Sequence, residues 1–272
     1  MKQIVYSIAL AVIFTACCKK KDITENDITF ETFIANETCP INPQDTVGGG
    51  CVIDITMVYP VAFADSAALG NIQQEIVGLM FGDEYFRSNP QEIINGYMEF
   101  EKENWQFTHN NFATALNRAK RDVLLNFNVT LHSEVRFNKG GVLAYLISKS
   151  MYEGGAHSLT GSNFLFFDLA TGSRIIEDDI FEDNYNEMLA AIFARSLQES
   201  LGSDTDNVLA DNDFENIFPN GNFYADEEGI TYLFHQDEIA FADLSGDEIE
   251  IFIPYKDIKS ILKRNSPIAV FF

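Results

Sequence analysis

Basic residues are scarce in this 272-residue sequence, which has 18 Lys and Arg against 41 Asp and Glu and a formal net charge of −23. A chain with this charge repels the phosphates of DNA, RNA and anionic lipid, and it attracts cationic partners at long range. The shortage of Lys and Arg relative to Asp and Glu therefore excludes a nucleic-acid-binding role. We expect a cationic partner, with solubility as the alternative reason for the acidity.

Histidine is also scarce, and its four residues, His109, His132, His157 and His235, are scattered along the chain. The sequence contains no His-Glu-x-x-His, Gly-x-Ser-x-Gly, Walker or dinucleotide-binding motif. Pairs of acids are uninformative where 41 acids are present. The sequence therefore predicts a protein that is not an enzyme, with no catalytic residue, no metal site and no cofactor. A carboxylate-dependent glycan hydrolase is the lesser alternative.

Long apolar runs are missing too, and the run from Ile4 to Phe14 is too short to span a bilayer comfortably. It follows Lys2 and precedes Phe14-Thr15-Ala16-Cys17, which resembles a bacterial lipobox. We expect residues 1–16 to be a lipoprotein signal peptide, Cys17 to be lipidated with acyl chains such as palmitate, and residues 17–27 to be a tether. The protein would then lie in the cell envelope, held by lipid alone at the outer membrane, on the periplasmic or the surface side.

Only two cysteines, Cys39 and Cys51, remain after Cys17 and Cys18. The segment between them contains no further Cys and no His for a metal site, and it includes Pro40, Pro43 and three glycines. In an oxidising compartment the simplest prediction is one disulfide, which stabilises a fold by about 2–4 kcal/mol.

The remaining sequence has enough apolar residues for a large core, including 24 Phe and 10 Tyr. Helical spacing predicts helices over 66–81, with Ser66 as N-cap, from Asn89 onward, over 185–201 and from Pro254. Alternating patterns predict strands over 28–38, 51–63, 123–151 with a hairpin turn at 138–141, 163–169, around 223, and over 230–234, 239–242 and 249–253. Because strands and helices come in blocks, we predict an α+β fold with a mainly antiparallel sheet packed against helices, in two intimately associated subdomains.

Four short motifs carry a resemblance to a known family: YEGGAH at 152–157, FFDLATG at 166–172, DDIF at 178–181 and IPY at 253–255. In order and spacing, residues 140–262 are similar to extracytoplasmic bacterial domains of unknown function. These paired domains form the ectodomain of RsiV-type, lysozyme-sensing anti-sigma factors and accompany some peptidoglycan deacetylases. The resemblance implies a C-terminal RsiV-like domain over 140–272 and a companion domain over 28–139.

The resemblance implies a binding role, since the sequence lacks the cytoplasmic and spanning segments of an anti-sigma factor and the catalytic domain of a deacetylase. We expect a non-catalytic envelope lipoprotein whose acidic ectodomain binds a cationic, lysozyme-like protein. The alternative is a module that binds cell-wall glycan.

The motif at 152–157 is the candidate binding loop, with Tyr152, Gly154, Gly155 and His157 as its residues. Paired glycines permit positive φ and shape a tight reversal after a strand. A lone histidine lacks the partners that a catalytic site requires, so a structural role for His157 within the turn is the favoured interpretation and a role in binding is the alternative.

Overall fold

The structure is a computed structural model that describes residues 23–42, 45–87, 89–112, 126–154, 157–201, 217–235, 238 and 248–272. The predicted signal peptide with Cys17, the loop residue Gly155 and the predicted strand over 239–242 lie outside these ranges. None of the described helices is long and apolar enough to cross a membrane.

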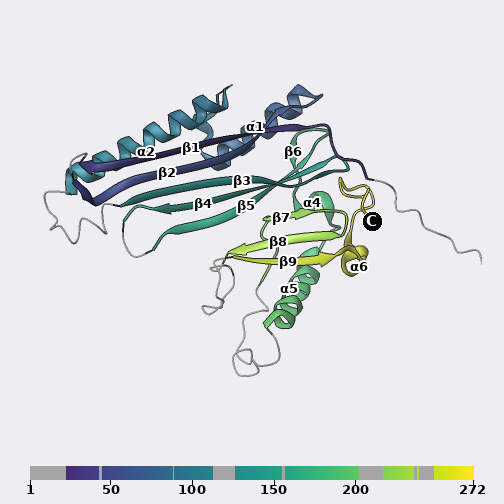
Figure 1. Cartoon of the computed structure of the whole chain (residues 1–272). Coiled ribbons are helices and arrows are strands. Elements are labelled where there is room, and N and C mark those ends of the chain that lie inside the picture. Colours follow the sequence, from purple (N-terminus) through teal and green to yellow (C-terminus); the bar gives the residue numbers. More distant parts are fainter. Residues whose placement is uncertain are drawn as a thin grey trace, which may run out of the picture.

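A long, mixed sheet forms the centre of the molecule (Figure 1). Its strands follow one another in chain order: β1 (Thr29–Asn42), β2 (Asp45–Ala62), β3 (Phe127–Lys139), β4 (Val142–Tyr152), β5 (Leu159–Asp168) and β6 (Ser173–Arg174). Only β2 and β3 pair in parallel, and the other neighbours are antiparallel. The predicted strand start at Asn163 is wrong, because β5 begins at Leu159, where its register with β4 already holds.

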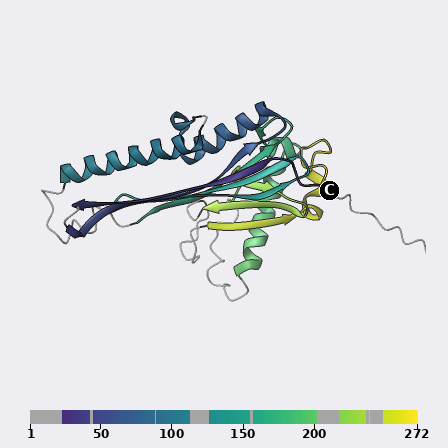
Figure 2. The same cartoon turned by 45° about the horizontal axis from the view of Figure 1, so that its top comes forward.

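Two helices cover one face of this sheet, and the second sheet lies on the other side (Figure 2). The helices are α1 (Ser66–Met80) and α2 (Pro90–Phe112), with a short 3₁₀ turn, η1 (Asp83–Tyr85), between them. Asn89 caps α2 as predicted, since its Oδ1 accepts a hydrogen bond from the Gln91 N–H at 3.0 Å. The prediction for α1 was wrong by one residue: Asp65 is its N-cap, and its carboxylate accepts from the N–H groups of Ala67 and Ala68.

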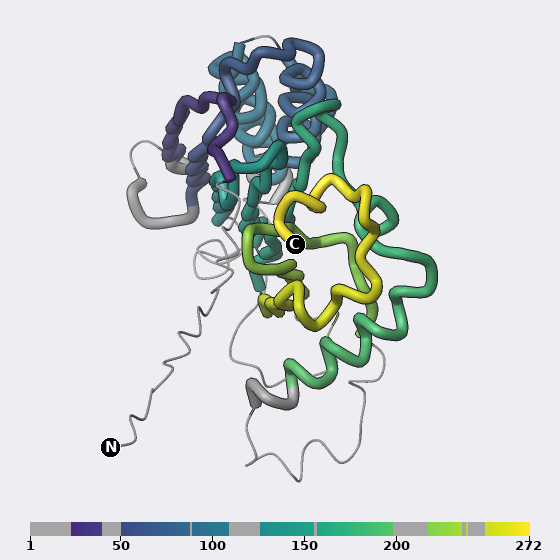
Figure 3. The backbone as a smooth tube through the Cα atoms, turned by 90° about the vertical axis from the view of Figure 1, so that its right-hand side faces the viewer, coloured from purple at the N-terminus to yellow at the C-terminus, as the bar shows by residue number. Residues whose placement is uncertain are grey.

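The second sheet has three antiparallel strands, β7 (Phe223–Ala225), β8 (Gly229–His235) and β9 (Glu248–Pro254). Around it lie the helices α4 (Glu177–Ile180), α5 (Tyr185–Leu201) and α6 (Tyr255–Ile258) and the 3₁₀ turn η6 (Lys259–Ile261). Viewed from its right-hand end, the molecule presents the C-terminal segment beside the second sheet (Figure 3).

Each sheet has its own hydrophobic core, and β4 contributes to both. Leu143 and Tyr145 point into the core under α1 and α2, whereas Val142 and Ala144 point into the core around α5 and the second sheet. Because side chains of a strand alternate between faces, one strand serves two cores. Residues 139 and 140, between which the domain boundary was predicted, lie in the turn of the β3–β4 hairpin, and the long sheet continues across this turn. The α+β class, the mainly antiparallel pairing and the two sheets agree with the sequence prediction.

A buried polar contact fastens β2 to β3 where their parallel ladder ends at Thr56 and His132. Just beyond that point, the Val58 N–H donates to the Ser133 hydroxyl oxygen at 3.0 Å. The Tyr145 hydroxyl lies 2.6 Å from the same oxygen and also contacts the Val58 carbonyl. Ser133 is fully buried, so these bonds satisfy groups that water cannot reach.

Candidate functional site

An open groove of about 230 Å³ lies where the long sheet meets the start of β9. Eight of its nine lining residues carry a polar side chain, although most of the surface that they expose to the groove is apolar: Thr130, His132, Ser148, Lys149, Ser150, Thr160, Gly161, Ser162 and Glu248. Ligand sites often occur where two packed units meet, with a few convergent polar groups. This groove is therefore the candidate functional site of the described residues.

The floor of the groove comes from the face of β3, β4 and β5 that the helices leave uncovered. Sheet register sets His132 opposite Ser148 and Ser148 opposite Ser162. One step along, Thr130 pairs with Ser150 and Ser150 with Thr160. Neighbouring strands lie about 4.8 Å apart, so the two rows form a compact grid of hydroxyl groups beside one imidazole.

One pair in this grid is already hydrogen-bonded, because the hydroxyl oxygens of Ser148 and Ser162 are 2.8 Å apart. Thr130, His132 and Thr160 are exposed, whereas Ser162 is buried. Ser148 and Ser162 therefore form the closed end of the floor, and the threonine row forms its open end.

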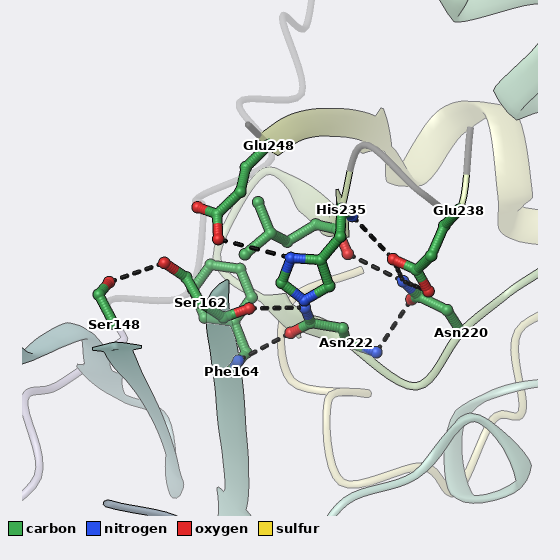
Figure 4. A network of polar contacts seen from close by, with 9 residues as sticks. Ser148, Ser162, Phe164, Asn220, Asn222, His235, Glu238 and Glu248 are labelled. Atoms are coloured by element: carbon green, nitrogen blue, oxygen red, sulfur yellow. Dashed lines mark hydrogen bonds and ion pairs between the residues drawn. The ribbon is translucent and has the colours of Figure 1, made fainter. Parts of the chain in front are cut away.

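The second sheet contributes Glu248 to the lining of the groove, and the imidazole of His235 lies behind this carboxylate, outside the lining. Glu248 begins β9 and pairs in register with His235, the last residue of β8. Their side chains approach to 3.5 Å between Oε1 of Glu248 and Nδ1 of His235, a contact that is ionic only when the imidazole is protonated (Figure 4). The imidazole lies against Gly161, where a Cβ would be 3.4 Å from Cε1 of His235.

Asn222 fixes the second sheet to the long sheet. Its amide nitrogen donates to the Ser162 carbonyl at 3.0 Å, and its side-chain oxygen accepts from the Phe164 N–H at 2.7 Å (Figure 4). The side-chain amide thus forms the hydrogen bonds that a neighbouring strand would form with the backbone at the edge of β5. Asn222 is buried, so both bonds are shielded from water.

A second asparagine extends the network toward Glu238. Asn220 accepts from the Asn222 N–H at 3.0 Å and donates to the Leu233 carbonyl and to Glu238. Glu238 in turn accepts from the His235 N–H at 2.7 Å. These bonds fix the end of β8, and with it the imidazole that faces Glu248 (Figure 4).

Lys149 differs from the other lining residues. It lies between Ile147 and Met151, which contact the core under the helices, so strand alternation directs its side chain to that face. Burial lowers the pKa of its ammonium group. The groove face of β4 is left to Ser148 and Ser150.

The structure places the predicted binding loop at the far end of the same strands. Tyr152 ends β4, opposite Asn128, and follows Ser148 and Ser150 on the same face. Gly154 has a φ of 85°, which agrees with the predicted positive-φ turn, and His157 is exposed. Gly155 lies outside the described residues. Tyr152 thus lies two residues beyond the lining residue Ser150, and neither Tyr152 nor His157 is among the residues that line the groove.

The predicted cysteine pair lies at this end as well. Cys39 is paired with Cys51, and Cys51 is paired with Phe127, one residue before the partner of Tyr152. Both thiols are free in the structure. The disulfide between them stays a prediction, with its two residues directly opposite each other.

Two of the family-like motifs have structural explanations. In FFDLATG, Gly172 has a φ of 71°, and a Cβ there would lie 2.3 Å from the Ala68 carbonyl oxygen, so only glycine fits against α1. In IPY, the Tyr255 hydroxyl donates to the Asp226 carbonyl at 2.6 Å and ties α6 to the turn after β7.

Sequence reasoning missed most of the groove, including the hydroxyl residues of its floor and Glu248. The available signal was the recurrence of Ser, Thr and His at every second position in three strands. This alternation indicates a shared site only when the register of the three strands is known, because the register brings the residues together. Among the described residues, no group of three or more His, Cys, Asp or Glu is arranged to hold a metal ion.

Comparisons with known proteins give a family for part of the chain. Residues 178–256 match the model of a protein family of unknown function, DUF3298. No curated protein matches the sequence.

Solved structures resemble the fold over most of the chain. A DUF3298 family member from Bacteroides fragilis has a TM-score of 0.77 at 23% identity, with 90% of this chain and 97% of that chain covered. A DUF3298 family protein from Pseudomonas aeruginosa has a TM-score of 0.56 at 16% identity, with coverage of 89% and 97%. The chain thus matches DUF3298 over residues 178–256 and has the fold seen in solved members of that family.

Proposed function

We propose that this protein is a cell-envelope lipoprotein, anchored through Cys17, whose acidic ectodomain binds a cationic protein of the lysozyme type. The resemblance of its motifs to RsiV-like ectodomains and the net charge of −23 motivate the proposal. Opposite charges steer association and raise its rate, and they favour cationic partners over acidic ones. In this proposal the protein binds and does not catalyse a reaction.

The observation that carries the proposal is a run of acids on α4 and the start of α5. Residues 175–194 contain no Lys or Arg and include six acids: Glu177, Asp178, Asp179, Glu182, Asp183 and Glu187. All except Glu177 are exposed. The Lys263 ammonium donates to the Asp178 carbonyl at 2.6 Å, so the segment carries one neighbouring cation, but its acids outnumber it and an excess of negative charge attracts a cationic protein.

The fold holds this acidic segment in place. Ile180 and Phe181 are buried in the second core, and the Glu182 N–H donates to the Ile261 carbonyl at 2.8 Å. The Lys263 N–H donates to the Ile180 carbonyl at the same distance, so the segment is bonded to the C-terminal part on both sides. A prepositioned surface loses less entropy on binding than a loose one.

Neutralising exposed acids tests the proposal. The variant Glu182→Gln, Asp183→Asn, Glu187→Gln removes three charges from the segment, and Glu75→Gln, Glu92→Gln, Glu103→Gln removes three exposed charges from α1 and α2 as the matched control. Isothermal titration of lysozyme into full-length protein in detergent should show binding that weakens with salt. The first variant should bind about tenfold more weakly and the control much less so. Lack of binding by the wild type, or equal losses in both variants, would contradict the proposal.

A further inference from the structure

We infer that the groove between the long sheet and β9 is a binding site for a short stretch of a neutral oligosaccharide. The site is separate from the acidic segment of the proposed function, and it needs neither the lipid anchor nor a protein partner. Its chemistry comes from the residues that line the groove.

The floor suits a ligand with many hydroxyl groups. Thr130, Ser150 and Thr160 form one row across three strands, and each hydroxyl both donates and accepts hydrogen bonds. Sugar hydroxyls have the same dual character, so they match such a grid in several orientations. The exposed side chains of Thr130 and Thr160 make this row accessible.

The two ends of the groove add groups of different kinds. Glu248 supplies carboxylate oxygens, which are strong hydrogen-bond acceptors for ligand hydroxyls. Beyond the other end, Tyr152 follows Ser150 on the same face of β4, so an aromatic residue lies next along the strand, just outside the lining of the groove. An acceptor, a hydroxyl grid and an aromatic residue in sequence along the strands form an arrangement for a chain of sugar rings.

The composition of the groove argues against a peptide. The floor strands β3, β4 and β5 are already paired with one another, so a bound peptide gains no backbone hydrogen bonds by adding to this face. No Leu, Ile, Val, Met, Phe, Tyr or Trp lines the groove, so it offers no pocket built from large apolar side chains for the anchor residues of a peptide.

The charges favour a neutral ligand. Glu248 is the acid of the lining, and strand alternation directs the side chain of Lys149, the lining residue with a basic side chain, toward the opposite face. The groove therefore presents no concentrated charge of either sign. Its volume of about 230 Å³ is below the roughly 300–1,000 Å³ of a pocket that encloses a drug-sized ligand, so it holds part of a chain whose ends continue into solvent.

The test measures binding of the GlcNAc tetrasaccharide to full-length protein in detergent, by ligand-observed NMR, without lysozyme. The variant Thr130→Val, Thr160→Val removes two groove hydroxyls at nearly constant volume. The control Thr32→Val, Thr38→Val makes the same change at exposed positions of β1, outside the groove. A third variant, Glu248→Gln, removes the carboxylate charge, and thermal unfolding confirms that each variant folds.

We expect the groove double variant to raise Kd about tenfold, since two hydrogen bonds of ordinary strength are lost, while the β1 control leaves Kd unchanged. Glu248→Gln should also weaken binding, and 0.5 M salt should not. Absence of binding by the wild type, equal effects of the two threonine variants, or displacement of the sugar by an unrelated extended peptide would each overturn the inference. Lysozyme binding by the same proteins is measured separately, so failure of one proposal does not imply failure of the other.

Discussion

Cys39 lies directly opposite Cys51 in the antiparallel pair of β1 and β2, and both thiols are free. Burial raises the pKa of the Cys51 thiol to about 12, with the adjacent Cys39 as the next cause. Burial and the neighbouring Glu37 raise the pKa of Cys39 as well. Since thiolates are the reactive form, both cysteines should react slowly with small disulfides at neutral pH.

We predict that the two cysteines are joined in protein taken from an oxidising envelope, where oxidases form disulfides. Mass spectrometry of non-reduced peptides should show the cross-link, and reduction should lower the free energy of unfolding by about 2–4 kcal/mol. Recovery of two alkylated thiols from freshly isolated protein would count against the disulfide.

Replacing Glu101 should stabilise the protein at neutral pH. Glu101 is 4% exposed, and burial raises the pKa of its carboxyl group, with Glu153 adding to the shift and the hydrogen bond with Tyr97 opposing it. Because the folded-state pKa lies above the unfolded value, the contribution of the Glu101 carboxyl group to the free energy of unfolding is fully present below the unfolded pKa. It is lost as pH rises through the folded-state pKa.

The difference in unfolding free energy between Glu101→Gln and wild type should therefore grow in favour of the variant as pH rises above the usual glutamate range. Urea unfolding between pH 4 and 8 measures it, with exposed Glu103→Gln as the control for the general effect of lost negative charge. If the difference in unfolding free energy between Glu101→Gln and wild type did not change with pH, the pKa of Glu101 would not be raised by folding and the prediction would be wrong.

Asn222→Ala should detach the second sheet from the edge of β5. It removes two buried hydrogen bonds, to the Ser162 carbonyl and from the Phe164 N–H, and leaves both backbone groups without these partners. We expect a loss of about 2–4 kcal/mol in urea unfolding, based on roughly 1–3 kcal/mol for each unsatisfied group. Asn36→Ala, which removes an exposed hydrogen bond to Asp54, serves as control and should cost under about 1 kcal/mol.

Gly154→Val should disturb the loop after β4 more than His157→Ala. Gly154 has a φ of 85°, which is strained for a β-branched residue at a cost of about 1–3 kcal/mol, whereas His157 is exposed. Differential scanning calorimetry of the two variants measures the effect. A His157→Ala protein with an unchanged melting temperature that no longer binds lysozyme would instead make His157 a binding residue.

Cys17→Ala should release the protein from membranes without changing its stability. In the proposed lipoprotein, the thiol carries the anchor and the described fold begins after the tether. Fractionation of cells followed by intact-mass measurement checks this result. A variant that stays in the membrane pellet with the mass of the unmodified chain would argue for attachment by another route.

The sequence by itself determined the secondary structure of the best-patterned segments and the α+β class. Period and capping residues are local properties, and they placed the helix from Asn89 and the helix beginning at Tyr185 correctly. The turn at Gly140 and Gly141 was equally local, because both residues adopt positive φ. The error at Ser66 arose because Asp65 and Ser66 are both good caps, and only the backbone geometry distinguishes them.

Only the tertiary structure decided the candidate site. His132, Ser148 and Ser162 are separated along the chain and become neighbours through the registers of β3, β4 and β5. Glu248 reaches them because Asn222 fastens the second sheet to the edge of β5. Register and sheet packing depend on contacts between distant segments, and no local pattern encodes those contacts. For the same reason, the sequence showed that Cys39 and Cys51 were candidates for pairing, and the fold set them face to face.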